Sequence, residues 1–357
     1  MSQRDHDMDE EKTCCHCSSI LIRHGVHQDR GRRTVMEDKH VIYHRFNDLV
    51  QRALVDKALE APEFFPLTHQ SVYVGLFDGH AGVAAAEFCK RYLHENIARS
   101  VPFSRNMAEA MVKGFLLTDR QFLDTARLSN EESGSVCVSA IYSASDSTLT
   151  IAHAGDSRAV LCRGGQAILL TDDHKPTSLE ERVRVEKNGG TVEWDMLNGV
   201  LDVSRAIGDF DRDLGLKTKG LTAQPETQLV NIDAADEFVI LACDGLWDVI
   251  GSEEAVQFVR SHLYAHDSVD AASEFLVQEA IRRQSDDNIT VIVIGFQKLD
   301  AVSKTKRIVP TDAVVDQLPA FAVIPSSPLI SPAKPPDRRR RPKMCAKGLA
   351  HVQGLLG

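Results

Sequence analysis

Apolar and polar residues follow one another in short runs along most of this chain, as is typical of a domain with many strands. Three continuous apolar runs are rich in β-branched or aromatic residues, which indicates buried strands. They cover residues 71–77 (SVYVGLF), 238–243 (FVILAC) and 289–296 (ITVIVIGF). Shorter strand candidates are residues 40–44, 136–142, 148–153 and 159–162. Because the strands come in groups and do not alternate strictly with helices, the pattern favours an α+β fold over a doubly wound parallel sheet.

Helices are expected where apolar residues recur at steps of three and four. One such face is formed by Met107, Met111, Phe115, Thr118 and Phe122. Another helix should begin after Ser178, because Ser178 and Glu181 have the spacing of a capping box, and should end near residues 188–190. The expected N-caps of two later helices are Ser252 and Ser268.

Composition divides the chain into a folded body and two polar ends. We expect residues 1–22 to be disordered, with little order before about Gly25, and residues 23–298 to form the folded domain. Within that domain, residues 46–70 have the character of an insertion, with a short helix and a Pro-containing loop. Residues 299–357 are Pro-rich and basic, and we expect them to be a disordered tail.

Charge is distributed unevenly between the body and the tail. Residues 301–357 carry ten Lys or Arg against three Asp or Glu, so they contribute +7, and residues 1–300 contribute −17, to the net charge of −10. An acidic body argues against nucleic acid as a partner, because phosphate backbones require a basic face. The acidity alone fits a solubilising surface as well as a site that gathers carboxylates for cations. The run from Arg338 to Arg341 fits a nuclear import signal, an anionic-surface contact or a solvated tail.

The eight cysteines predict no disulfide framework. Four stand singly in apolar runs, as buried thiols do: Cys89, Cys137, Cys162 and Cys243. The adjacent Cys14, Cys15, His16 and Cys17 favour an oxidisable terminus over a zinc site, since adjacent ligands cannot readily surround one tetrahedral ion. There is no secretory leader and no apolar run of the roughly 18 residues that a membrane helix needs. We therefore expect the protein in the cytoplasm, the nucleus or both.

Carboxylates stand at the ends of the three strongest strand candidates. These are Asp78 in Asp78-Gly79-His80, Asp244 in Asp244-Gly245, and Asp287 in Asp286-Asp287-Asn288; a fourth acidic pair, Glu37-Asp38, precedes the first strand. Buried carboxylates that meet would repel one another unless cations neutralise them. Oxygen ligands without a His/Cys cluster favour Mg²⁺ or Mn²⁺ over Zn²⁺. Asp-Gly is also a common turn, but no return strand follows directly here.

A series of short motifs resembles the protein phosphatase 2C family of metal-dependent protein phosphatases. In chain order they are RTVMED at residues 33–38, FDGHAG at 77–82, GDSR at 155–158, DHKP at 173–176, NGG at 188–190, VSRAIGD at 203–209, ACDGLWDV at 242–249 and SDDNIT at 285–290. They cover most of the chain in the family's order. The resemblance implies a four-layer αββα sandwich of two antiparallel sheets flanked by helices, with a binuclear metal cleft at one end.

The resemblance also assigns metal ligands. Asp78 would bridge two Mg²⁺ or Mn²⁺ ions, and the Gly79 carbonyl would coordinate one of them. The direct protein ligands would be completed by Asp244 and Asp287. A third and weaker ion would use Asp156 and Asp248 together with Asp244.

The remaining roles are catalytic. Glu37 and Asp38 would act mainly through metal-bound waters, Arg33 would bind the substrate phosphate, and His80 would be the general acid. An arginine fork suits phosphate oxygens better than a lysine does, and a histidine titrates in the range needed to protonate an alkoxide. By this analogy the nucleophile is a hydroxide bridging the two metals.

The residues and the resemblance together predict a protein serine/threonine phosphatase with a monomeric catalytic domain and phosphorylated proteins as substrates. The alternatives are a catalytically inactive scaffold or regulatory binding protein, and an enzyme for a small phosphorylated metabolite. All the expected carboxylates are present, which favours the enzyme over the scaffold. Departures from the family pattern are Val136, His153 and Asp202, together with a divergent stretch in the substrate-contacting flap at residues 175–200.

Overall fold

Antiparallel strands form the centre of the structure, a computed structural model that describes residues 20–67 and 70–298. One sheet has the strand order β1-β15-β14-β6-β7 and the other has the order β13-β5-β4-β3-β2, with β10 paired to the beginning of β4. The first sheet consists of β1 (Ile20–Asp29), β15 (Ile289–Lys298), β14 (Asp236–Ala242), β6 (Arg158–Arg163) and β7 (Gln166–Leu169). The second consists of β13 (Glu226–Asn231), β5 (Thr148–Ala154), β4 (Gly134–Ser143), β3 (Ser71–His80), β2 (Lys39–Tyr43) and β10 (Ile207–Gly208).

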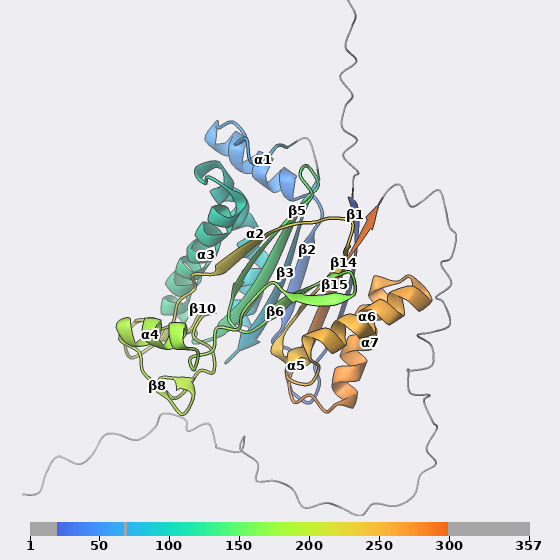
Figure 1. The fold of residues 1–357 in the computed structure, drawn as a ribbon. Coiled ribbons are helices and arrows are strands. Elements are labelled where there is room, and N and C mark those ends of the chain that lie inside the picture. Colours follow the sequence, from blue (N-terminus) through green and yellow to red (C-terminus); the bar gives the residue numbers. More distant parts are fainter. Residues whose placement is uncertain (1–19, 68–69, 299–357) are drawn as a thin grey trace, which may run out of the picture. The chain divides into compact units, whose positions relative to one another are not determined.

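Helices cover the outer face of each sheet (Figure 1). The second sheet is covered by α2 (Ala84–Ser100) and α3 (Met107–Ser129), which are joined by the 3₁₀ turn η1 (Val101–Phe103). The first sheet is covered by α5 (Asp244–Trp247), α6 (Ser252–His266) and α7 (Val269–Arg282). The predicted four-layer αββα sandwich is therefore confirmed.

Alternate residues of the central strands face either the opposite sheet or the helices. In β3, Val74 and Leu76 pack between the sheets, whereas Tyr73 and Phe77 pack against α2 and α3. Strands β14 and β15 alternate in the same way between the inter-sheet core and the α6–α7 layer. Both faces of these strands are buried, which explains why their sequences are continuous apolar runs.

The seven predicted strands are all found, with ends shifted by a few residues, and the capping bonds predicted for Ser178 and Ser268 are present. Two predictions are wrong. Strand β1 includes residues 20–24, ahead of the predicted onset of order near Gly25, because it is hydrogen-bonded along its length to β15. The N-cap of α6 is Gly251 and not Ser252, since the Gly251 carbonyl accepts the first helical hydrogen bond, from Ala255.

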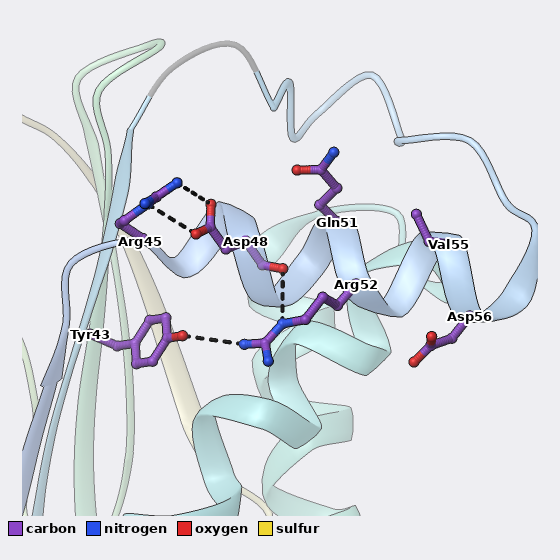
Figure 2. Close-up of a pocket in the computed structure, with 7 residues that line it drawn as sticks. All are labelled: Tyr43, Arg45, Asp48, Gln51, Arg52, Val55 and Asp56. Atoms are coloured by element: carbon purple, nitrogen blue, oxygen red, sulfur yellow. Dashed lines mark hydrogen bonds and ion pairs between the residues drawn. The ribbon is translucent and has the colours of Figure 1, made fainter.

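The predicted insertion at residues 46–70 begins with α1 (Phe46–Lys57), which buries Phe46 and Val50 against the aromatic core around Tyr73. Its outer face and β2 line a groove of about 620 Å³, in which Arg52 donates hydrogen bonds to the Tyr43 hydroxyl and to the Asp48 carbonyl (Figure 2). Tyr43 on β2 pairs with Tyr73 on β3. Tyr73 lies seven residues before His80, where β3 ends in the Asp78-Gly79-His80 sequence. At about 3.3 Å per residue this is about 23 Å, so this end of β2 lies well away from the DGH end of β3.

Two small units lie between β7 and β13. The flap consists of α4 (Leu179–Lys187), β8 (Val192–Glu193) and β9 (Met196–Leu197). It is followed by β10 and by the hairpin of β11 (Phe210–Asp211) and β12 (Leu216–Lys217). None of the helices in the described part of the chain is both long and apolar enough to cross a bilayer. The Cys14–Cys17 cluster and the arginine run at 338–341 lie outside the described residues.

Candidate metal centre

Strand ends from both sheets bring the predicted carboxylates together. Strand β3 continues through His80, so Asp78 lies within a strand and not after one, as the sequence pattern had suggested. Asp244 is the first residue of α5, directly after β14, and Asp287 lies in the turn that enters β15. Because β14 and β15 are hydrogen-bonded neighbours, Asp244 and Asp287 lie at the same end of the first sheet.

The cluster has its centre at Asp78. Carboxylate oxygens of Asp78, Asp156 and Asp244 all lie within 4.8 Å of one another. Oxygens of Asp38 and Asp78 form a second such group with the thiol of Cys243. The structure therefore joins Asp78 to Asp244 as predicted, and it also brings Asp156 into the centre.

Burial raises the pKa of every carboxylate in this cluster. For Asp38 the rise is to about 6, because the loss of water outweighs the hydrogen bond of 2.7 Å that the Thr290 hydroxyl donates. The pKa values of Asp78 and Asp244 are raised well above their usual range, first by burial and then by repulsion from the neighbouring carboxylates. Within residues 20–67 and 70–298, no Lys or Arg is salt-bridged to these three aspartates. The site thus concentrates negative charge that lacks a direct protein counter-ion.

Two basic side chains lie at the edge of the cluster. The Arg33 guanidinium contacts Asp287 at 2.5 Å and donates to the Asp286 carbonyl at 3.1 Å. The Lys175 ammonium is hydrogen-bonded to Asp156. Asp287 is not among the carboxylates that meet within 4.8 Å, although burial, opposed by Arg33, still raises its pKa. Asp248 acts on the cluster through space, since its charge contributes to the raised pKa values of Asp244 and Asp287.

Backbone packing fixes the acidic pair that precedes β2. A Cβ atom at Gly79 would lie 2.7 Å from the Glu37 carbonyl oxygen, so glycine allows the two backbones to approach. The Asn288 side chain accepts from the Glu37 amide at 2.7 Å and donates to the Arg30 and Val35 carbonyls. Sequence reasoning missed Asn288, although it stands inside the SDDNIT motif.

His80 lies at the end of β3, where its Nε2 is 2.7 Å from Oδ1 of Asp209. Burial alone would lower the pKa of His80, but the attraction and hydrogen bond of Asp209 outweigh it, so that the pKa is raised. Sequence reasoning assigned no role to Asp209, whose only signal was its place at the end of the VSRAIGD motif.

The donor set suits a hard divalent cation. It offers carboxylate and carbonyl oxygens, which Mg²⁺ and Mn²⁺ prefer. A bound cation would also neutralise the negative charge of the carboxylates. The single nearby thiol, Cys243, is fully buried, and burial raises its pKa well above the usual range. The neutral thiol is a poor metal ligand, because it is the thiolate that binds metal ions.

The fold and the site define a four-layer αββα sandwich whose buried acidic centre could hold metal ions. Comparison with known proteins identifies the family. The family model described as "Protein phosphatase 2C" matches residues 22–289. A rice protein described as "Probable protein phosphatase 2C 57" is 38% identical over 281 residues, which cover 77% of this chain and 73% of that protein. The chain belongs to the protein phosphatase 2C family, a family of protein serine/threonine phosphatases.

Solved structures share this fold. The chain is similar to a C. elegans sex-determining protein at 26% identity and a TM-score of 0.63, with 77% of this chain and 64% of that chain covered. It is also similar in fold to a serine-threonine phosphatase 2C from Toxoplasma gondii, at 24% identity and a TM-score of 0.63, over 77% and 95% of the two chains. The chain thus spans somewhat less than two thirds of the C. elegans protein.

Proposed function

We propose that this protein hydrolyses phosphoserine and phosphothreonine in other proteins, in a reaction that requires two Mg²⁺ or Mn²⁺ ions and is carried out by one catalytic domain, residues 23–298. The observation that carries the proposal is the meeting of Asp78, Asp156 and Asp244 oxygens within 4.8 Å, with Asp78 and Asp244 free of any salt bridge among the described residues. Such a centre is unfavourable without cations and is suited to bind them.

The metal ligands would be Asp78, the Gly79 carbonyl, Asp244 and Asp287, with Glu37 and Asp38 held behind them. When bound, the two ions neutralise charge on the phosphate oxygens and bring the pKa of a coordinated water close to 7. Asp156, with Asp248, would contribute to a third and weaker cation site. Lys175 supplies a positive charge to Asp156 in this structure, so that a third ion would have to compete with its ammonium group.

Two further residues would act on the substrate directly. The Arg33 side chain is half exposed, so its guanidinium can exchange its contact with Asp287 for two hydrogen bonds to a phosphate. His80 is partly exposed and held by Asp209, so it can donate a proton to the departing serine or threonine oxygen. Phosphoryl transfer depends mainly on such positioning and charge neutralisation.

The test is turnover of a phosphoserine and phosphothreonine peptide panel during titration with Mn²⁺ or Mg²⁺. We expect hydrolysis that EDTA stops, and a loss of several orders of magnitude in Asp244→Asn, with calorimetry reporting cation binding in parallel. A wild type that binds the cations but cleaves no peptide in the panel would support the inactive scaffold instead. Equal turnover in wild type and Asp244→Asn would contradict the assigned site.

A further inference from the structure

Asp209 holds His80, the histidine at the end of β3 two residues after Asp78. Its Oδ1 lies 2.7 Å from Nε2 of His80, and only 5% of the Asp209 side chain is exposed, against 27% of His80. An ionised carboxylate can only accept hydrogen bonds, so Nε2 must carry the proton. Nδ1 is then the ring nitrogen that remains for a substrate.

The backbone fixes the position of this carboxylate. Asp209 has a φ of 59°, in the left-handed region, and the preceding Gly208 has a φ of 92°. The Asp209 amide donates to the Ser133 carbonyl at 3.0 Å, and the Asp209 carbonyl accepts from the Thr218 amide at 2.9 Å and from its hydroxyl at 3.0 Å. A left-handed conformation is strained for a non-glycine residue, and it persists where the surroundings determine it.

Space for the pair is provided by Gly134. A Cβ atom at this position would lie 2.2 Å from Nε2 of His80 and 2.2 Å from Oδ2 of Asp209. Gly134 is the residue of β4 that pairs with His80 on β3 and with Gly208 on β10. Strands β3, β4 and β10 thus meet beside the hydrogen bond between His80 and Asp209. The space for this bond exists because Gly134 on β4 has no side chain. The second oxygen of Asp209 is buried and has no hydrogen-bond partner among the described residues, so in this part of the chain the carboxylate is held for its contact with His80 and not as part of a wider salt-bridge network.

We propose that Asp209 is a positioning residue for phosphate ester cleavage: it holds the His80 ring so that Nδ1 presents a proton to the leaving oxygen of the substrate. The inference rests on the proposed function. In the step it serves, the bond from phosphorus to the serine oxygen breaks as the bond from phosphorus to a water oxygen forms. The Nδ1 proton passes to the serine oxygen, and the proton lost by the water restores the charged imidazole. An aspartate that fixes the tautomer and orientation of a histidine acts in this way in hydrolytic triads.

The leaving group distinguishes this role from a purely structural one. A serine alkoxide needs a proton in order to leave, whereas p-nitrophenolate leaves as a stable anion. General acid catalysis is worth about 10²- to 10⁴-fold, so we expect Asp209→Asn to lower kcat on a phosphoserine peptide about 100-fold. On p-nitrophenyl phosphate we expect a change of less than about threefold, and KM should be nearly unchanged for both substrates.

Two controls accompany this measurement. Asp213→Asn changes an exposed aspartate four residues further on, in the same hairpin, and should leave both activities unchanged. His80→Gln should show the same dependence on the leaving group, and adding Asp209→Asn to it should cost little more, because residues that act as a unit are not additive. Equal losses on both substrates, or additive losses in the double variant, would overturn the proposal.

Nitrogen-15 NMR of the Mg²⁺-loaded protein tests the geometry without turnover. Wild-type His80 should show a protonated Nε2 bonded to an acceptor, and Asp209→Asn should alter that signature while Asp213→Asn does not. A neutral ring with its proton on Nδ1 in the wild type would overturn the proposal. If the wild type cleaves neither substrate, the proposed function fails, and the nitrogen spectrum still decides whether Asp209 sets the tautomer.

Discussion

Neutralising Asp38 should stabilise the metal-free protein. Asp38 is 1% exposed and lies beside Asp78, and burial raises its pKa to about 6 from a usual value of 3.8. A carboxyl with a raised folded-state pKa weakens folding as the pH rises above its unfolded-state value, and the whole effect is present once the pH exceeds its folded-state value. Each unit of pKa is worth about 1.4 kcal/mol. The ionised Asp38 therefore costs the fold about 3 kcal/mol at pH 7.5 and about 2 kcal/mol at pH 5.

Asp38→Asn removes this cost while keeping the shape of the side chain. Its amide oxygen can still accept the hydrogen bond from the Thr290 hydroxyl, and its NH₂ group can donate to Asp78. At 2 to 4 °C per kcal/mol for a domain of this size, the midpoint of unfolding should rise by about 6 to 12 °C in EDTA at pH 7.5. At pH 5 the rise should be clearly smaller.

The assay is thermal unfolding followed by circular dichroism, with and without Mn²⁺. Cation binding to the folded state should stabilise the wild type more than the variant, since the variant offers less charge to the ions. Asp124→Asn, at an exposed position on α3, serves as the control and should shift stability by less than about 0.5 kcal/mol. A lower midpoint for Asp38→Asn in EDTA at pH 7.5, or a gain that does not shrink at pH 5, would refute the reasoning.

Three further predictions follow from the same contacts. Arg33→Lys replaces a fork by a point charge and should raise KM for a phosphopeptide about tenfold, whereas Arg32→Lys, on a surface ion pair, should leave KM unchanged. Burial would raise the pKa of Glu181, but hydrogen bonds from two arginines and a serine hold it at about 2, so its stabilisation is present above about pH 4.5 and is lost as the pH falls toward 2. Glu181→Gln should therefore cost about 3 kcal/mol at pH 7 in urea unfolding and less at pH 3. Lys175→Met should cost the metal-free protein about 2 kcal/mol, because Asp156 loses its partner, and should increase the stabilisation that Mn²⁺ provides.

The strand pattern and the central carboxylates could be predicted because their signals are local. A strand buried on both faces is apolar along most of its length, as β3 is at residues 72–77, β14 at 238–242 and β15 at 291–296. Asp78 and Asp244 interrupt or follow such runs, where a charged residue needs a special reason. Strand β1 was missed because Arg23, His24 and His27 interrupt its apolar residues, and because its partner β15 lies far along the chain.

Asp209 and Asn288 could not be assigned roles from the sequence, for a different reason. Each acts through a contact across more than a hundred residues, from Asp209 to His80 and from Asn288 to Glu37. Such contacts depend on the register between strands, and a shift of one residue would turn the side chains to the opposite face. A short sequence motif contains no information about the register between two strands.

The same physics links the fold to the requirement for cations. A carboxylate at the end of a strand paired on both sides cannot move away from its neighbours, because the hydrogen-bond ladder fixes its backbone. In the folded state, burial raises the pKa values of Asp38, Asp78 and Asp244, and repulsion from neighbouring carboxylates adds to the rise at Asp78 and Asp244. A flexible acidic loop would spread its charges and bind a cation only after paying the entropy of ordering. The rigid sandwich holds the carboxylates close together before any metal binds. The charges therefore destabilise the metal-free fold and strengthen metal binding. Asp38→Asn should reveal both effects, as a higher stability in EDTA and a smaller stabilisation by Mn²⁺.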